Sequence, residues 1–262
     1  MPRMPDFGVR AARYDDLRPA DASWWRLFEV LVREGDLEGR RVLEVGCGTG
    51  QLAAALAGRA KAAVWAVDPE PAMVELARTR VPTARVAQAE ALPFEDAMFE
   101  RLVLRLVVHL LDRKRALPEL RRVLAGDGRV VIATFDPSHF DGFWLAPLFP
   151  TLEAIDRTRF PEPGGLAAEL EAAGFASTRI VRVSQQHELE RAHALERIRG
   201  RHISTFDLLE EDELEAGTAR AERELAERVE VRLEWALVVA DVEGARSASS
   251  RRGGSPPPRL DG

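Results

Sequence analysis

Residues 42–50 of the chain read Val-Leu-Glu-Val-Gly-Cys-Gly-Thr-Gly. The apolar residues at 41–45 are typical of a short buried strand, and the glycines that follow at once are typical of a tight turn. Residues 51–57, Gln-Leu-Ala-Ala-Ala-Leu-Ala, then favour a helix, because alanine and leucine have high helix propensity. Glycines let the backbone approach a ligand, and a helix start offers free N–H groups, so this order predicts a ligand site.

A second signal lies 18 positions beyond Gly50, at Asp68. Residues 62–67 predict the next strand, and an acid at its end can accept hydrogen bonds from both hydroxyls of a ribose. Pro69 fits the first turn of a helix that would run to about residue 80. Two alternatives stay open: the glycine turn could hold no ligand, and Asp68 could cap that helix.

The rest of the chain continues the alternation of strands and helices, which indicates parallel βαβ units. Further strands are expected at 84–87, 101–107, 129–133, 178–183 and 232–240. Helices are expected at 113–124, 166–173, 188–199 and 211–229. The predicted fold class is therefore α/β: a Rossmann-like, doubly wound, mostly parallel seven-stranded sheet with helices on both faces and an antiparallel last strand.

The same pattern divides the chain into three parts. Residues 1–38 look helical and predict an N-terminal cap. Residues 39–243 are expected to form the main domain, with a helical insertion at about 185–230. Residues 244–262 are Ser, Gly, Pro and Arg with little to bury, so a disordered tail is expected.

Composition narrows the classes of function. The 262 residues are 46% hydrophobic and 31% charged, as in globular proteins. The net charge of −6 argues against a nucleic acid as the main partner. No window is apolar enough for a membrane span and the start lacks a secretory signal, so we expect a cytoplasmic protein. Cys47 is the single cysteine, no cluster has metal-ligand spacing, and nothing indicates a particular oligomer.

The chain resembles the class I S-adenosylmethionine-dependent methyltransferases, specifically the methyltransferase type 11 group. The resemblance covers about residues 42–133, a little over a third of the chain. It rests on 42–50, on Val-Asp-Pro at 67–69, on Ala-Glu-Ala-Leu-Pro-Phe at 89–94, on Phe-Glu at 99–100, on His109 and on 124–132. Residues 12–15 with 18–19 also resemble the segment that precedes the fold in many relatives.

This resemblance implies S-adenosyl-L-methionine as cofactor and a role for each matching residue. The loop would line the methionine part, through Gly46, Cys47, Gly48 and Gly50. Glu44 would hold the amino group, and Asp68 the ribose. The adenosine would be flanked by Pro69, Met73, Gln88, Ala89 and Glu90. Leu106 to His109 would lie near the methyl group. Gln88 stands where the family often has Asp, and it keeps a carbonyl acceptor for the adenine amino group.

The methyl acceptor is expected to be a small molecule, and a base is needed only if its accepting atom carries a proton. His109 is the candidate base, because imidazole titrates near neutral pH; alternatively it bonds a nearby carbonyl. Tyr14 would touch cofactor or acceptor, or simply pack. Arg105, in a strand where small or apolar residues are usual, is expected to face the active-site end and help select the substrate.

Other expectations concern the surroundings of the site. Lid segments are expected in the N-terminal helices and around 137–160 and 187–215. His187, His193 and His202 are expected on the surface. Two other functions compete: a nicotinamide-dependent dehydrogenase, against which the G-x-G-x-G spacing counts, and a non-catalytic cofactor-binding protein.

Overall fold

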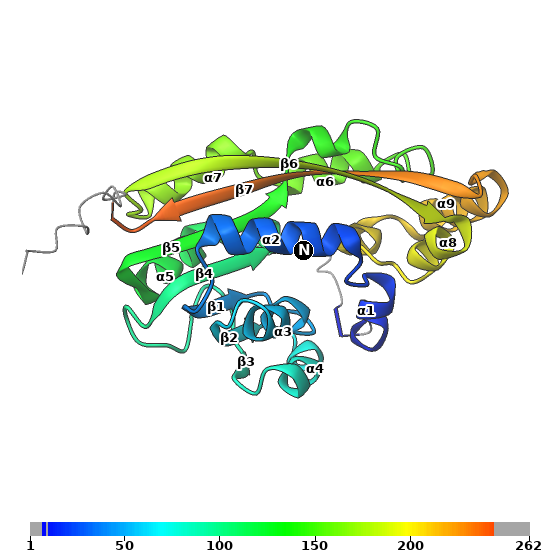
Figure 1. Cartoon of the computed structure of the whole chain (residues 1–262). Coiled ribbons are helices and arrows are strands. Elements are labelled where there is room, and N and C mark those ends of the chain that lie inside the picture. The colour runs from blue at the N-terminus through cyan, green and yellow to red at the C-terminus, as the bar shows by residue number, and fades with distance from the viewer. Residues whose placement is uncertain (1–6, 9, 244–262) are drawn as a thin grey trace, which may run out of the picture.

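The computed structural model describes residues 7–8 and 10–243, so the expected tail at 244–262 and part of the expected cap lie outside the described residues. One seven-stranded sheet runs through the molecule in the order β3-β2-β1-β4-β5-β7-β6 (Figure 1). The strands are β1 Arg41–Val45, β2 Ala63–Asp68, β3 Ala84–Val86, β4 Phe99–Arg105, β5 Leu124–Phe135, β6 Ser177–Glu190 and β7 Arg228–Asp241. Neighbours among β1 to β5 pair in parallel, whereas β7 is antiparallel to β5 and β6. The predicted fold class is confirmed.

Helices cover both faces of this sheet. The α-helices are α1 Tyr14–Leu17, α2 Ala22–Gly35, α3 Gln51–Gly58, α4 Pro71–Arg80, α5 Arg113–Val123, α6 Leu152–Arg159, α7 Pro163–Ala172, α8 Arg191–Arg199 and α9 Glu211–Glu224. Short 3-10 helices are η1 Ala11–Arg13, η2 Val108–Leu110, η3 Pro137–Phe140 and η4 Ser204–Leu208.

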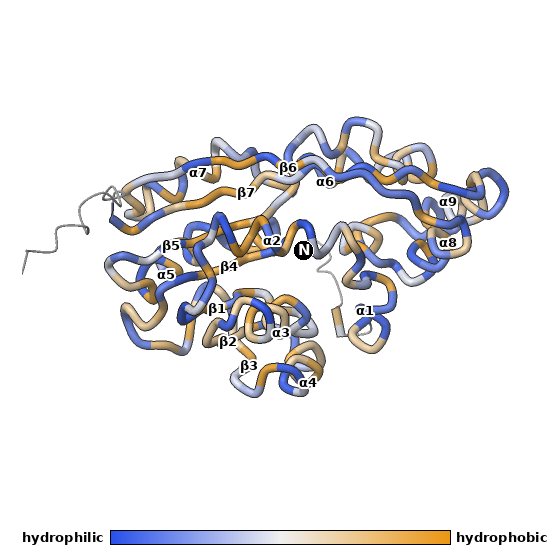
Figure 2. Tube along the Cα trace, viewed as in Figure 1, coloured by the Kyte–Doolittle hydropathy of each residue, from blue (hydrophilic) through white to orange (hydrophobic). Residues whose placement is uncertain are grey.

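Neighbouring residues of one strand point into different cores, because side chains alternate along a strand. Val42 of β1 joins a core with α2, α3 and α4. Leu43, the next residue, joins the core that contains α5 and α7. Figure 2 shows β7 hydrophobic over much of the stretch that lies beside β5. A sheet buried on both faces therefore explains the near-continuous apolar strands.

The last two strands are longer than the sequence predicts. The final pair between β5 and β7 is Phe135 with Trp235, but β6 and β7 stay paired as far as Glu190 with Arg228. They project past β5 as a two-stranded ribbon that carries α8 and α9 (Figure 1). The expected helices at 188–199 and 211–229 are therefore too long, and the helical insertion spans 191–224. Burial alternates along residues 184–190, as is typical of a strand. The sequence did not indicate this part of the strand, because nearly all of these residues are polar.

Two smaller boundaries also differ. Helix α4 begins at Pro71 rather than Pro69, and its N-cap is Glu70, whose side chain accepts a hydrogen bond from the Ala72 backbone N–H. Strand β4 ends at Arg105, because Leu106 adopts a left-handed backbone with φ of 55°. Both changes lie beside the site described below.

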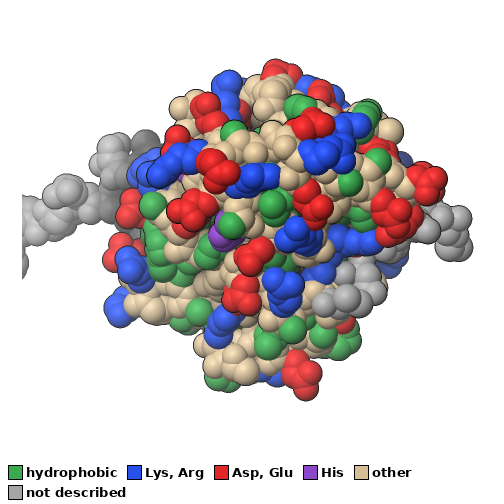
Figure 3. Space-filling view, turned by 90° about the vertical axis from the view of Figure 1, so that its right-hand side faces the viewer, with side chains coloured by type: hydrophobic (Ala, Val, Ile, Leu, Met, Phe, Trp, Pro, Cys, Tyr) green, Lys and Arg blue, Asp and Glu red, His purple; other side chains and the backbone are tan. Residues whose placement is uncertain are grey.

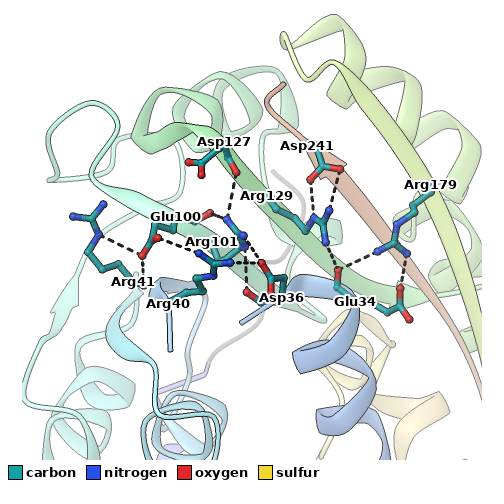
Figure 4. A network of polar contacts seen from close by, with 10 residues as sticks. All are labelled: Glu34, Asp36, Arg40, Arg41, Glu100, Arg101, Asp127, Arg129, Arg179 and Asp241. Carbon is teal, nitrogen blue, oxygen red and sulfur yellow. Dashed lines mark hydrogen bonds and ion pairs between the residues drawn. The ribbon is translucent and has the colours of Figure 1, made fainter. Parts of the chain in front are cut away.

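Ion pairs fix the C-terminal end of α2 to the sheet (Figure 4). The Arg129 guanidinium pairs with Asp241 at 2.6 Å and donates to the backbone carbonyl of Glu34 at 3.1 Å. Arg101 pairs with Asp36 and donates to the Asp36 carbonyl. These bonds satisfy carbonyls that a helix end leaves without partners. Among the described residues, no helix is long and apolar enough to cross a membrane.

Candidate active site

A cavity of about 450 Å³ lies at the carboxyl ends of β1, β2 and β4, which is where ligands bind in doubly wound sheets. Its volume is typical of a small-molecule site. Most of the predicted cofactor residues line it, together with Tyr14. These predicted residues are Tyr14, Gly46, Gly48, Asp68, Pro69, Met73, Gln88, Ala89, Glu90 and Leu106.

The glycine turn and the acid at the end of β2 are in direct contact. The backbone N–H of Gly48 donates to one carboxylate oxygen of Asp68 at 2.8 Å, and that of Glu70 donates to the other at 3.0 Å. Burial raises the pKa of Asp68, although these two hydrogen bonds act to lower it. Asp68 is not the N-cap of α4, since Glu70 has that role. The carboxylate therefore faces the cavity beside the turn.

Two of the glycines are required by close approaches of the backbone. Gly46 has φ of 74°, and a Cβ there would lie 2.4 Å from a methyl carbon of Val107. Gly50 has φ of 79°, and a Cβ there would lie 3.0 Å from Cα of Ala77 in α4. Gly50 thus lets α3 pack on α4 and does not itself line the cavity. Cys47 also lies outside the lining; it is buried in the core, which raises the pKa of its thiol.

Glu44 is also not among the residues that line the cavity; it is buried beneath the turn with an unsatisfied oxygen. Its side chain is 3% exposed, and Oε2 has no hydrogen-bond partner within the described part of the chain. Burial raises the pKa of this carboxyl to about 8, although the nearby Arg105 charge acts to lower it. An unsatisfied buried acceptor of this kind is suited to a cationic donor.

The chain after β4 forms another part of the cavity wall, directly beside Gly46 of the glycine turn. The left-handed backbone at Leu106 turns the chain away from the sheet into η2, and Val107, Leu110 and Leu111 line the cavity. From the sequence, this segment was expected to lie near the methyl group only as far as His109. Arg105 and Val107, both expected at this end of the sheet, line the cavity. The lining residues that the sequence did not indicate are Phe7, Val45, Glu70, Ala87, Leu110, Leu111, Asp112 and Arg115. The lining residues at 110–115 could have been predicted, because they follow the end of a parallel strand, where ligands bind in such sheets.

His109 lies on η2 but is not among the residues that line the cavity. Its ring stacks on Phe160 with centroids 4.0 Å apart, and its Nδ1 has no partner among the described residues. Burial lowers its pKa to about 3, and the charges of Arg159 and Arg18 act in the same direction. The imidazole is neutral near pH 7 and a weak base there. Tyr14, in contrast, lines the cavity, and its hydroxyl oxygen accepts a hydrogen bond from Arg18 at 3.3 Å.

A second, smaller cavity of about 140 Å³ adjoins the first. Arg105 and Leu106 line both cavities, so Arg105 does lie at the active-site end of β4. His187 and His202 line the second cavity, and the expectation that they are surface residues is wrong. The ribbon of β6 and β7 and the helix α8 bring them over the end of the sheet, which their charged sequence neighbours did not indicate.

The burial and the geometry of these residues fit S-adenosyl-L-methionine. Glu44 has an unsatisfied buried oxygen for an amino group, and Gly46 leaves no room for a side chain beside Val107. Asp68 and Glu70 present carboxylates on one side of the cavity.

The comparisons with known proteins agree with this site. A family model described as a methyltransferase domain matches residues 43–132. The ubiquinone/menaquinone biosynthesis C-methyltransferase UbiE of Geotalea uraniireducens is 30% identical over 200 residues, 70% of this chain and 82% of that protein. The malonyl-[acyl-carrier protein] O-methyltransferase of Halorhodospira halophila is 39% identical over 143 residues, 50% of this chain and 47% of that protein. A putative methyltransferase from an antibiotic biosynthesis pathway of Anabaena variabilis shares the fold, with a TM-score of 0.66, 21% identity and coverage of 82% and 96%.

Fold, cavity and relatives together define a methyltransferase. The chain belongs to the class I S-adenosylmethionine-dependent methyltransferases, with S-adenosyl-L-methionine as its cofactor. The relatives favour this function over the nicotinamide-dependent dehydrogenase that the sequence left open.

Proposed function

We propose that the larger cavity holds S-adenosyl-L-methionine and the smaller one a small-molecule methyl acceptor. Glu44 accepts from the amino group, Asp68 from the ribose hydroxyls, and the segment Gln88 to Glu90 borders the adenine. The observation that carries this assignment is the 2.8 Å bond between the Gly48 N–H and Asp68, which joins turn and acid in one wall of the cavity. The two cavities meet at Arg105 and Leu106, so donor and acceptor would be neighbours.

The bound cofactor supplies an electrophilic methyl group on a sulfonium. The protein's task is then to hold the acceptor in line and exclude water, and positioning alone can contribute roughly 7–11 kcal/mol in the best cases. Trp24, Phe135 and Trp235 line the acceptor cavity and exclude water from it. With a pKa of about 3, His109 has little basicity, and its contact with Phe160 positions η2 beside the cofactor.

A small molecule fits the molecule better than a nucleic acid does. Figure 3 shows the face over α8 and α9 with Lys and Arg side chains interspersed among Asp and Glu. Nucleic-acid binding usually requires a face of predominantly basic residues. The acceptor cavity, with a volume of about 140 Å³, has room for a group of the size of a single ring.

The test is cofactor binding by an Asp68→Ala variant. Without the carboxylate, ribose hydroxyls lose their acceptor, and we expect the affinity for S-adenosylhomocysteine to fall at least about tenfold. Isothermal titration calorimetry measures this, with Asp141→Ala as control because Asp141 is 70% exposed on another part of the surface. Unchanged affinity of Asp68→Ala, or binding of NAD in place of the adenosyl ligand, would contradict the proposal.

A further inference from the structure

The second cavity is bordered by arginines that lack acidic partners. The Arg105 guanidinium makes no hydrogen bond or ion pair with any described residue; it lies over the rings of Trp24 and Trp235, 5.7 and 5.8 Å from their centroids. Arg197 has a buried Nε without a partner in the described chain. Arg18 donates to the His202 carbonyl at 2.8 Å and to a tyrosine hydroxyl, both of them neutral.

Three arginines and a single carboxylate, Asp21, line this cavity, so the acid offsets only part of the positive charge that it shares the cavity with. Asp21 lines it, but it accepts hydrogen bonds from the Ser23 hydroxyl at 2.6 Å and the Trp24 N–H at 2.9 Å, and forms no ion pair within 4.0 Å among the described residues. Glu44 is not among the residues that line this cavity, and it forms no ion pair within 4.0 Å in the described part of the chain, although the Arg105 charge acts on it. Glu234 is paired with Arg232.

Elsewhere in the protein, arginines packed against the sheet form ion pairs with acidic side chains. Arg101, 6% exposed, pairs with Asp36, and Arg129 pairs with Asp241. Burying a charge without an ion-pair partner is costly, so three arginines beside one carboxylate mark a place for a further negative charge.

The size and the walls of the cavity restrict the rest of the ligand. A cavity of about 150 Å³ holds one benzene molecule, and this one measures about 140 Å³. Phe135 and Trp235 lie on one side with centroids 4.8 Å apart, and Trp24 and Trp144 also line it. A single flat ring between aromatic side chains fits these walls.

We propose that the methyl acceptor binds here as an anion, a single-ring aromatic acid whose anionic oxygen is held by Arg105, Arg18 and Arg197. This inference rests on the proposed function. Because Arg105 borders both cavities, the anionic oxygen lies on the side next to the cofactor and is itself the accepting atom. The oxygen forms the new O–CH₃ bond with its own electron pair, while the C–S bond breaks and its pair stays on sulfur. Negative and positive charge cancel, so no proton is released and no base is required.

Small single-ring probes of similar size test this assignment by calorimetry, with the protein saturated in S-adenosylhomocysteine and at a pH above the pKa of 4-nitrophenol. Benzoate and 4-nitrophenolate carry the anion under these conditions, benzyl alcohol is the neutral match and benzylamine the cationic one. We expect the anions to bind at least about tenfold more tightly than benzyl alcohol, as for a charge-assisted hydrogen bond, and benzylamine not to bind. The ranking of benzoate against 4-nitrophenolate distinguishes a carboxylate acceptor from a phenolate.

Arginine variants test which side chains produce the preference for anions. Arg105→Met and Arg197→Met should each remove the preference for anions, while Arg197→Lys should retain part of it because the charge remains. Arg228→Met is the matched control, since Arg228 is 71% exposed and paired with Glu188 on the ribbon. Equal affinity for all the probes in a wild-type protein that still binds S-adenosylhomocysteine would overturn the anion site alone. Failure of the wild type to bind S-adenosylhomocysteine would overturn the proposed function.

Discussion

Glu44 is the residue whose chemistry depends most on what fills the cofactor cavity. Its burial raises the pKa to about 8, and one of its oxygens is unsatisfied in the described chain. A cationic amino group beside it favours the charged form, so cofactor binding should draw the carboxyl pKa downward. Binding at neutral pH must then release a proton from Glu44.

We therefore expect proton release on binding of S-adenosylhomocysteine, and its loss in Glu44→Gln. Titrations at about pH 7 in buffers of different ionisation enthalpy measure the protons directly. The wild type should release up to about one proton, and the glutamine variant clearly fewer. Equal proton release from both proteins would show that Glu44 is not the group that responds to the ligand.

Stability of the ligand-free protein gives an independent check with a definite sign. A carboxyl whose pKa is higher in the folded state than in the unfolded state binds more protons when folded. Stability therefore falls as the pH rises from the ordinary carboxyl pKa of 4.5 to the folded-state pKa of about 8. Glu44→Gln lacks this loss, so its stability relative to the wild type should increase over that range.

At the scale of elements, α2 is held by the polar contacts at its C-terminal end. Asp36 follows this helix in a left-handed conformation, with φ of 50°, and its carboxylate pairs with Arg101 and Arg40. Burial is the largest single influence and acts to raise the Asp36 pKa, but the hydrogen bonds and charges of Arg101 and Arg40 together lower it. The pairing thus stabilises the fold above the carboxyl's unfolded pKa and is lost as the pH falls through the folded pKa.

Asp36→Asn removes the charge without disturbing the backbone, because asparagine tolerates a left-handed conformation. We expect the variant to lose about 1 kcal/mol of unfolding free energy at neutral pH, since the carboxylate is partly exposed and screened. Urea unfolding measures the loss, which should shrink as the pH falls through the pKa of Asp36. Asp141→Asn, at a more exposed pair, should change stability by less than about 0.5 kcal/mol. A loss that persisted unchanged in acid would assign the effect to something other than the charge.

The same elements show which parts of the structure a sequence can predict. The unit from β1 through the glycine turn to β2 and Asp68 was predicted well, because local periodicity and turn chemistry determine it. The length of the β6–β7 ribbon was not, because the pairing of Glu190 with Arg228 depends on contacts far apart in the chain. For the same reason, Arg18 and Arg197 could not be placed at one cavity from their positions in the sequence.

At the scale of the whole molecule, the two cavities are built by different parts of the chain. The residues that line the cofactor cavity fall between positions 7 and 115, whereas the acceptor cavity adds residues of η3, the ribbon and the region around α8. The segment after η3, together with α6, α8, η4 and α9, forms a separate apolar cluster that includes Phe149, Ile198 and Phe206. Phe143, Trp144 and Ile203 connect this cluster to the acceptor cavity, because they also line it. Acceptor binding should therefore be sensitive to changes in this cluster that leave the cofactor cavity intact.

Gly217 in α9 is the place to test this separation. A Cβ there would lie 2.2 Å from the Phe149 ring and 2.8 Å from the Leu148 carbonyl, so Gly217→Ala forces α9 away from its neighbour. Overpacking costs about 1–3 kcal/mol, and the gain in helix propensity returns at most about 1 kcal/mol, so net destabilisation is expected. Because α9 packs against α8, the shift should weaken benzoate binding, while the affinity for S-adenosylhomocysteine stays within about twofold, a difference of well under 1 kcal/mol.

Gly58 of α3 provides the matched control, because a Cβ there would meet nothing within 4 Å. Gly58→Ala should raise the unfolding free energy by about 0.4–1 kcal/mol through the unfolded chain, with both ligands bound as in the wild type. Calorimetry with each ligand and urea unfolding measure the pair of variants. If Gly217→Ala weakened cofactor and benzoate equally, the insertion would act on the whole sheet, and the acceptor cavity could not be treated as a separately built part. If the affinity for both ligands were unaltered while stability fell, the shift of α9 would not reach Arg197, and the expected link between α9 and the acceptor cavity would be wrong.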